Sequence, residues 1–359
     1  MSANEIIIAL MAGFALLGAV DRIFGNKLGL GKEFEDGIQA MGSLALAMVG
    51  IICLAPVLAN LLKPVVVPVY TTLGADPAMF AGTILACDMG GAALAQEMTG
   101  DSRAALLGGV LTGSMLGATI VFTIPVAMGI LKEDDRPAMA KGILSGIVTV
   151  PVGIFAGGLV AGFPIGMVLK NLVPVVVIGL VIALGLWKFE KGMIRGFGIF
   201  GKVIIGVITV GLALAIVEGL TGFAIVEGMV PIEESFLTVG EIAIVLAGAF
   251  PLVFVLTKVL KKPLMKLGAK LGINEIAAAG LLASLANSIA TFGLVKDMDR
   301  RGKVVNIAFS VSAAFVFGDH LGFTAGFAPE MLPAMIVGKL AGGISAIFVA
   351  MLLTRKEAV

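Results

Sequence analysis

An acidic residue lies inside an apolar stretch of this 359-residue chain, where a charge is expensive. Asp88 sits in the middle of segment 78–98, two residues before Gly90 and Gly91. A carboxylate near the centre of a bilayer costs about 2.5–3.5 kcal/mol on insertion scales, so a helix end, a proton or a cationic ligand must compensate it. The two glycines allow the backbone to open or turn there. Asp88 is therefore either a ligand-binding acid or the cap of a broken helix.

Asp319 and His320 form a second candidate pair. They lie between Gly318 and Gly322 in the apolar run 304–328, and His320 is the only histidine of the chain. One histidine cannot build a conventional histidine-rich metal site. The pair can serve as a site acid beside a proton-sensitive partner, because imidazole titrates near neutral pH. It can also stabilise a kink, since the flanking glycines predict a break or hinge in the helix.

A third group of polar residues occupies the equivalent position in the second half of the chain. Asn287 and Ser288 lie in the middle of the apolar segment 271–295, and Thr291 follows one helical turn later. Amides and hydroxyls can hydrogen-bond a hydroxyl group of a ligand, or they can cap the ends of two half-helices. The sequence leaves both roles open.

Basic residues on both flanks of 271–295 predict that this segment enters and leaves a membrane on the same side. They precede it from Lys258 to Lys270 and follow it from Lys296 to Lys303. Short basic loops remain in the cytoplasm, whereas a simple span shows a charge contrast between its ends. Backbone that turns at membrane depth must be buried in protein or face a wet cavity. The sequence therefore predicts a re-entrant hairpin and, with it, a cavity for a solute.

Composition agrees with a membrane location. Hydrophobic residues make up 59% of the chain and charged residues 14%, whereas a soluble domain has about 25% charged residues. The mean hydropathy is +1.10. The net charge of +1 provides no field that would recruit nucleic acid. Cys53 and Cys87 both lie in apolar segments, which excludes a disulfide framework. The first apolar run, 6–20, lacks the features of a cleaved signal peptide and is expected to remain as a helix.

Apolar runs and their flanking charges predict the topology. About nine spans plus two hairpins are expected, with the N-terminus outside and the C-terminus in the cytoplasm. The basic segment 188–202 is expected to be a cytoplasmic loop, and the glutamate-bearing segment 218–241 an external one. The spans are expected near 5–20, 40–62, 104–131, 142–168, 171–187, 202–217, 242–260, 304–328 and 333–354.

The two halves of the chain repeat each other in sequence. Leu85-Ala86 corresponds to Leu285-Ala286, and Pro137-Ala138-Met139 corresponds in the same order to Pro333-Ala334-Met335. Matching segments carry opposite flanking charges, which predicts inverted repeats, the pattern of secondary transporters. The predicted fold is an all-α polytopic membrane protein of two inverted-topology repeats, each with an interrupted hairpin. Its parts are residues 1–168 with a hairpin near 78–98, a linking helix and cytoplasmic loop at 169–195, and residues 196–359 with a hairpin near 271–295.

One segment matches the residue spacing of a nucleotide-binding motif but lacks its structural context. Residues 196–201 fit the spacing of the dinucleotide fingerprint, but no strand precedes them and they lie between two spans. We therefore expect no nucleotide or other cofactor, no metal and no nucleic-acid partner.

The polar motifs resemble those of the ethanolamine permeases of bacterial ethanolamine-utilisation systems. The resemblance rests on residues 85–91, 285–288, 298–304 and 318–323, and it extends over essentially the whole chain. It implies a carrier of the inner membrane, not an enzyme, that supplies ethanolamine to a cytoplasmic degradation pathway. One departure is the short loop around 170–174, where some relatives have a longer insertion.

Ethanolamine suits the candidate residues. The resemblance implies that its ammonium group faces Asp88 or Asp319 and that its hydroxyl faces Asn287, Ser288 or Thr291. Because no ATP motif is present, transport is expected to be facilitated or ion-coupled. A channel-like facilitator, a sensor without transport, and a carrier of another small amine or polar solute are the alternatives. The lipid bilayer is the surrounding partner, and the sequence leaves a homo-oligomer open.

Overall fold

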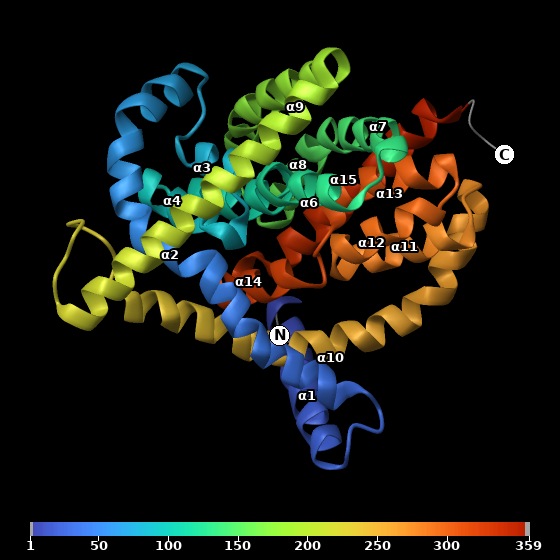
Figure 1. Ribbon diagram of the computed structural model, residues 1–359, viewed down its shortest axis with the longest axis horizontal. Helices are drawn as coiled ribbons and strands as arrows, with labels where there is room; N and C mark the ends of the chain where they lie inside the picture. Colours follow the sequence, from blue (N-terminus) through green and yellow to red (C-terminus); the bar gives the residue numbers. More distant parts are fainter. Residues whose placement is uncertain (1–2, 356–359) are drawn as a thin grey trace.

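The computed structural model describes residues 3–355, which form helices joined by turns and contain no strand (Figure 1). The all-α class predicted from the apolar runs is thereby confirmed for these residues. The α-helices are α1 (Ala3–Ile23), α2 (Leu30–Thr72), α3 (Ala78–Ile84), α4 (Gly91–Met98), α5 (Ser102–Ala105), α6 (Ile124–Ile130), α7 (Arg136–Ile147), α8 (Val150–Val160), α9 (Ile165–Thr221), α10 (Ile232–Leu271), α11 (Glu275–Ala286), α12 (Ser288–Leu294), α13 (Arg300–Ala313), α14 (Asp319–Phe327) and α15 (Leu332–Leu353). Segments of 3-10 or π-helix are η1 (Cys87–Met89), η2 (Leu106–Gly117), η3 (Thr119–Thr123), η4 (Glu133–Asp135), η5 (Val295–Asp297) and η6 (Pro329–Met331).

Within residues 3–355, seven helical stretches are long and apolar enough to cross a membrane. Within a bilayer every backbone N–H and C=O must be bonded inside the protein, and a continuous helix of about 20 apolar residues meets that demand. The chain is therefore a multi-pass membrane protein. The seven stretches are Asn4–Ile23, Leu30–Thr72, Ser102–Ile130, Glu133–Val160, Ile165–Thr221, Ile232–Leu271 and Pro329–Leu353.

Helix α9 corrects one prediction. The segment 188–202 was expected to be a loop, but it is helical apart from a break at Phe189, whose φ is −135° and ψ is 41°. Lysine and arginine are good helix formers, so a cluster of basic residues can sit in a helix that continues beyond the bilayer. The break divides the 57 residues of α9 into two helices that meet at an angle.

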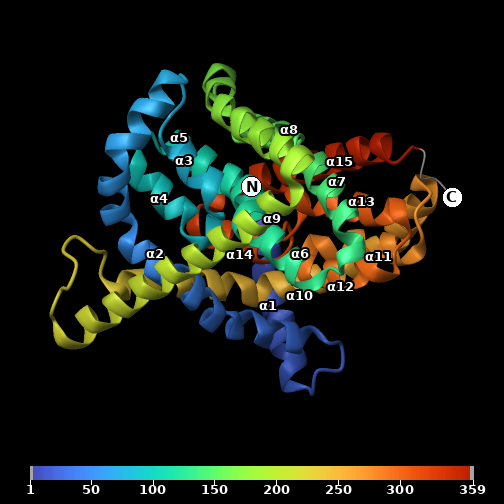
Figure 2. The same cartoon turned by 45° about the horizontal axis from the view of Figure 1, so that its top comes forward.

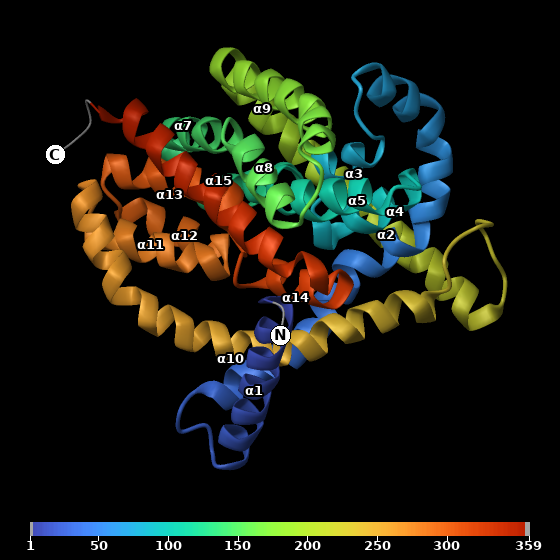
Figure 3. The same ribbon diagram turned by 180° about the vertical axis from the view of Figure 1, so that it is seen from behind.

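Helices on two opposite sides enclose the centre of the molecule. Helix α10 packs along α2 and α1 and forms one side, with α1 projecting beyond it, whereas α7 and the first part of α9 lie on the opposite side (Figures 1 and 3). Helix α15 crosses between them and packs against α7, α8 and α13. The tilted view shows α6 and α12, which come from different halves of the chain, side by side (Figure 2).

Two pairs of short helices lie within this frame. Helices α3 and α4 pack against each other, as do α11 and α12. The first pair is interrupted at Leu85 and Ala86, which are extended, and the second at Asn287, with φ −157° and ψ 126°. These interruptions fall inside the segments 78–98 and 271–295 that the sequence singled out.

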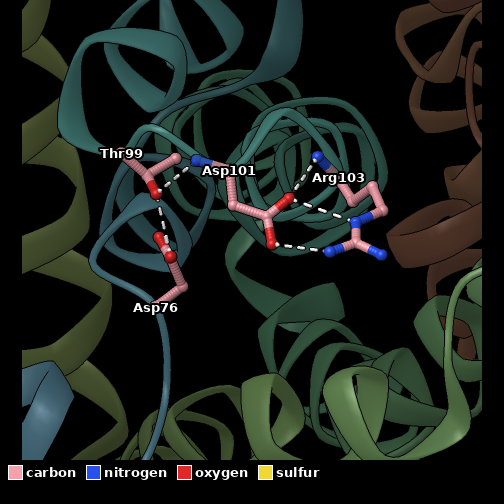
Figure 4. A network of polar contacts seen from close by, with 4 residues as sticks. All are labelled: Asp76, Thr99, Asp101 and Arg103. Carbon is pink, nitrogen blue, oxygen red and sulfur yellow. Dashed lines mark hydrogen bonds and ion pairs between the residues drawn. The ribbon is translucent and has the colours of Figure 1, made fainter.

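A polar network closes the open end of the first pair (Figure 4). Thr99 after α4 donates from Oγ1 to Oδ2 of Asp76 before α3, at 2.9 Å, and accepts from the N–H of Asp101. Asp101 caps α5 by accepting from the N–H of Arg103, and it pairs with the Arg103 guanidinium at 3.2 Å. That guanidinium, together with the backbone donors, holds the pKa of the Asp101 carboxyl below its usual value.

The second pair is closed in a related way. Asp299 caps α13 by accepting from the N–H of Gly302, and its other oxygen accepts from the N–H of Asn274, which precedes α11. An aspartate thus accepts the bond that ties each pair at its base: Asp76 accepts from Thr99 in the first pair, and Asp299 accepts from Asn274 in the second. The tie fixes the two legs of the pair and leaves the interrupted tip to be placed by its other neighbours.

Asp101→Asn keeps the side-chain cap of α5 but removes the ion pair with Arg103. Because the pair is partly exposed, we expect a loss of about 0.2–1 kcal/mol in the free energy of unfolding at pH 7. A carboxyl whose pKa is depressed in the folded state stabilises the fold above its ordinary value of 3.8, and that stability is lost as the pH falls through the folded value. The difference between wild type and variant should therefore shrink as the pH falls below 3.8 in thermal unfolding of the purified protein. The exposed Asp134→Asn is the control, and an equal effect of both variants at every pH would contradict the assignment.

Candidate functional site

The interruption of the first helix pair places Asp88. After the extended Ala86, the turn η1 carries Cys87 and Asp88, and Gly90 follows with φ +86°. A Cβ atom at Gly90 would lie 2.1 Å from the side chain of Ile51 in α2, so both the backbone angle and the space require glycine there. The turn directs the Asp88 carboxylate into a cavity.

Close packing against η2 holds this turn. A Cβ atom at Gly117 would lie 1.8 Å from the carbonyl oxygen of Leu85, and one at Gly113 would lie 3.0 Å from the nitrogen of Cys87. Only residues without a side chain let the two backbones approach so closely. Helix η2 therefore acts as the wall against which the turn that carries Asp88 is set.

A second interruption places Asp319 and His320. The chain leaves α13 after Ala313 and starts α14 at Asp319, and between them Phe315 takes the left-handed conformation with φ +64°. The N–H of Phe315 donates to the carbonyl of Ser284, and the N–H of Phe317 donates to the carbonyl of Leu285. Carbonyl groups at the end of α11 are thus satisfied by the interrupted segment, as buried helix ends require.

The two interruptions bring residues of both halves together. The Nε2 atom of His320 lies 3.7 Å from Oδ1 of Asp88. The His320 ring is buried against Phe315 at 5.2 Å between ring centres, and Phe122 stands edge-on to Phe315. Asp319 lines the same cavity as Asp88 and interacts with it electrostatically. Three of the residues singled out in the sequence therefore share one place.

The cavity has a volume of about 1200 Å³ and runs from these residues to the surface. Its outer part is lined by α7, α9 and η4, where Glu133 and Arg136 form an exposed ion pair at 3.2 Å. A solute that enters there meets charged groups of both signs before it reaches Asp88 and Asp319. The other charged residues of the outer part are Glu190, Lys191, Arg195 and Lys202.

Lys339 does not line the cavity but acts electrostatically on Asp88, and the sequence analysis missed it. It is the only charged residue of α15, and its side chain is 1% exposed. Its Nζ atom donates to the backbone carbonyl of Ser114 in η2, and the ammonium interacts electrostatically with Asp88 and Cys87. A single lysine within an otherwise uncharged span was the signal that could have identified it, because such charges are expensive.

The three polar residues of the second helix pair lie elsewhere. None of Asn287, Ser288 and Thr291 lines the large cavity. Asn287 caps α12 by accepting from the N–H of Ile289, and the Thr291 hydroxyl bonds to Ser284 and to the carbonyl of Gly280. Ser288 is fully buried. Contact of these three residues with a substrate hydroxyl stays a prediction, while the hydrogen bonds of Asn287 and Thr291 in this structure support α11 and α12.

Of the predicted hinge glycines, one differs from expectation. Gly90 and Gly91 stand at the interruption before α4, and Gly318 stands at the one before α14. Gly322 lies within α14, so the helix does not break there. A Cβ atom at Gly322 would lie 2.1 Å from the Leu246 side chain, so this glycine allows α14 to pack closely on α10.

Three possible metal ligands also meet at the inner site. One ligand atom each of Cys87, Asp88 and His320 lie within 4.8 Å of one another. The Lys339 ammonium interacts with both Cys87 and Asp88, and its positive charge opposes a divalent cation there.

A multi-pass helical protein with buried acids at the end of a deep cavity is built as a membrane transport protein. The comparisons with known proteins agree with this class. The chain belongs to the EutH family, because the family model described as "Ethanolamine utilisation protein, EutH" matches residues 3–353. No solved structure matches the chain.

Named relatives specify the family further. The chain is 60% identical over 356 residues to the probable ethanolamine permease EutH of Listeria monocytogenes, which covers 99% of this chain and 95% of that protein. It is 49% identical to the probable ethanolamine permease EutH of Escherichia coli, with 99% and 97% covered. It is also 53% identical to the uncharacterized protein YxeR of Bacillus subtilis, with 96% and 94% covered. Relatives with a functional name are permeases, and the family is one of transporters rather than enzymes.

Gly117→Ala should loosen the wall that holds the Asp88 turn. The new methyl group would overlap the carbonyl of Leu85, and overpacking of this kind costs about 1–3 kcal/mol. We expect a lower midpoint of thermal unfolding in detergent and weaker binding of the solute. Gly206→Ala is the control, since nothing lies within 4 Å of a Cβ atom there. Equal midpoints for both variants would show that the contact with Leu85 is not a constraint.

Proposed function

We propose that this protein is an ethanolamine permease that carries the protonated amine across the membrane through the large cavity. The observation that supports it is the convergence of Asp88 and Asp319, from the two halves of the chain, at the buried end of that cavity. The names of the relatives provide the identity of the substrate. The carboxylates provide negative charge that attracts the substrate, because a primary amine is mostly protonated at neutral pH.

The inner site offers a contact for each part of ethanolamine. An ammonium group donates three hydrogen bonds and is best met by carboxylates, which Asp88 and Asp319 provide. The ring of Phe315 stands beside them and can face the cation. The hydroxyl group is short enough to reach the imidazole of His320 or a backbone carbonyl of the interrupted segments. A molecule this small fills only the inner part of the cavity, and the rest is its route of entry.

Inverted repeats are the architecture that we propose for this carrier. A long helix, a pair of short helices tied by an aspartate, and a helix with proline in its first turn follow one another twice, as α2, α3–α4 and α7 and again as α10, α11–α12 and α15. With α9 counted as two spans and α13–α14 as one interrupted span, nine spans and two re-entrant hairpins result. The opposite flanking charges of the two halves support their inverted orientation.

The position of the cavity mouth supports a conformation open to the cytoplasm. The mouth is lined by residues of 132–141 and 188–202, whose basic side chains favour the cytoplasmic side. The inner end closes on Phe315 and His320, both buried. A closed inner end favours alternating access over an open channel, with ethanolamine carried by facilitated or ion-coupled transport.

Asp88→Asn tests the binding role. The variant keeps the size of the side chain and removes the charge, and the lost charge-assisted hydrogen bond corresponds to about 1.5–3 kcal/mol, or about 10- to 150-fold in affinity. Uptake of labelled ethanolamine by proteoliposomes, with and without a pH gradient, should saturate for the wild type and require far more substrate for the variant. The exposed Asp134→Asn is the matched control. Uptake that never saturates would favour a channel, and binding without flux would favour a sensor.

The proposed topology places both ends of the second helix pair in the cytoplasm. Cysteines at Lys270 and Arg300, both exposed and close to the tie between Asn274 and Asp299, should resist an impermeant thiol reagent in intact cells. A cysteine at Glu233, at the start of α10, should react, because that end lies outside. The natural Cys53 and Cys87 are buried and give little background. Reaction at only one of Lys270→Cys and Arg300→Cys would rule out the re-entrant arrangement.

A further inference from the structure

One ion pair joins the two halves of the chain beside the mouth of the cavity. The ammonium of Lys303, near the start of α13, donates to Oδ1 of Asp135 in η4. The side chains of Lys303 and Asp135 are 19% and 6% exposed, so both charges are largely removed from water. A buried ion pair adds little net stability, because desolvation offsets most of its attraction. Its position therefore calls for a reason other than stability.

The ion pair fixes a short corner of the chain, residues 132–137, which connects α6 to α7. The corner is entered through Leu131 and Lys132, both extended, and it contains η4 and the first two residues of α7. Three of its side chains line the mouth of the cavity, and they are Glu133, Arg136 and Pro137. Asp135 is buried instead and bonds to α13. The ion pair thus holds this wall of the mouth against α13.

Beyond the corner, the backbone of α7 lies directly on α13. A Cβ atom at Gly142 would lie 3.0 Å from the carbonyl oxygen of Val304, and one at Gly146 would lie 2.8 Å from that of Ala308. These contacts begin about two helical turns after Asp135, so they can hold α7 in place while the corner moves. The ion pair is therefore the contact that must part if the corner leaves α13.

The opposite wall of the mouth carries charges that complement the corner. Lys191, Arg195 and Lys202 belong to α9 and line the mouth, and at about 100° per residue they point to one side of that helix. Glu133 of the corner pairs with Arg136 of the same corner, in an exposed contact at 3.2 Å. Exposed pairs of this kind contribute little. Glu133 can therefore exchange Arg136 for a basic residue of α9 at small cost.

We infer that Asp135 and Lys303 are positioning residues for transport: their ion pair holds the corner on α13 and the mouth open, and it parts when the corner closes on α9. This inference rests on the proposed function, which requires a mouth that opens and closes. On closure, Glu133 gains a basic partner in α9. Helix α13 leads from Lys303 to the interruption at 314–318, so the same ion pair links the mouth to the segment that carries Phe315 of the inner site.

Crosslinking across the mouth tests the inference in the purified full-length protein. Cysteines at Pro137 and Ile199, which line the two walls, form a disulfide under a mild oxidant when the walls approach each other. The natural Cys53 and Cys87 are buried and do not line the cavity. The measured quantity is the rate of disulfide formation, followed by mass spectrometry. With the ion pair intact, this rate should be low, because the mouth is held open.

Lys303→Met should raise the rate by about 10- to 100-fold, the factor that corresponds to one charge-assisted hydrogen bond lost from the open state alone. The charge-swapped double variant, Asp135→Lys with Lys303→Asp, should return the rate toward the wild-type value. Recovery by the swap separates the ion pair from a packing defect, which the swap would not repair.

Two further comparisons sharpen the test. Glu133→Gln, added to Lys303→Met, should lower the rate again, because the closed mouth loses its ion pair with α9. Asp134→Asn and Arg300→Gln change exposed neighbours in η4 and α13 and are the matched controls. Both controls should keep the wild-type rate.

The role of the ion pair and the proposed function fail in different ways. An unchanged rate in Lys303→Met, no recovery in the swapped variant, or wild-type crosslinking as fast as that of Lys303→Met would refute the role of the pair, and ethanolamine uptake by the wild type would leave the proposed function standing. If the wild type neither binds nor carries ethanolamine, the proposed function fails and the assignment of the pair to transport fails with it.

A second variant keeps the test decisive if Lys303→Met does not fold. The double variant Asp135→Asn with Lys303→Met leaves no unpaired charge in the interior, and an unpaired buried charge is the main cause of misfolding after such a change. Its crosslinking rate should show the same rise over the wild type. A wild-type rate in this double variant would overturn the inference.

Discussion

The structure depends on one constraint: every backbone break and every charge inside the apolar interior must find its partner within the protein. The interruptions at Ala86, at Asn287 and at 314–318 each free backbone groups that lipid cannot satisfy. The chain meets this by placing two of them against each other, so that N–H groups of 314–318 bond to carbonyls at the end of α11. The third is set against η2, where Gly117 admits the carbonyl of Leu85 at close range. Interruptions that must be buried are thereby gathered near the centre of the molecule.

The same constraint produces the site. Because the helix interruptions are buried near the centre of the molecule, the side chains next to them are also brought together there. Asp88 follows the break at Ala86 and Asp319 follows the break at 314–318, and His320 lies 3.7 Å from Asp88. Lys339 comes from an uninterrupted helix, and its charge acts on Asp88.

Many of the helices and two of the acidic site residues could be predicted from the sequence. The features that could not be predicted have physical explanations. Asp88 and Asp319 were identified because an acid in an apolar run is conspicuous, and a glycine next to such an acid marks a break. The helical conformation of 188–202 was not predicted, because basic residues indicate where a chain leaves the membrane but do not indicate that the helix ends there. Lys339 could have been noticed as a lone charge in an apolar run, but its partners could not: the Ser114 carbonyl that accepts its hydrogen bond and the Asp88 carboxylate on which its charge acts are more than two hundred positions away in the chain. Contacts at that separation follow from packing, which no local pattern encodes.

Phe315 shows how tightly the parts are joined. A residue with a side chain in the left-handed region is strained by about 1–3 kcal/mol, so the conformation persists only where its surroundings demand it. Here the N–H of Phe315 is held by Ser284 of α11, while its ring lies between Phe122 of η3 and the His320 ring. One residue thus contacts the end of a short helix of the second half, a helix of the first half and the site itself. A relative shift of α11 and η3 would therefore act directly on His320 and, through it, on Asp88, which is the coupling between fold and site that a carrier requires.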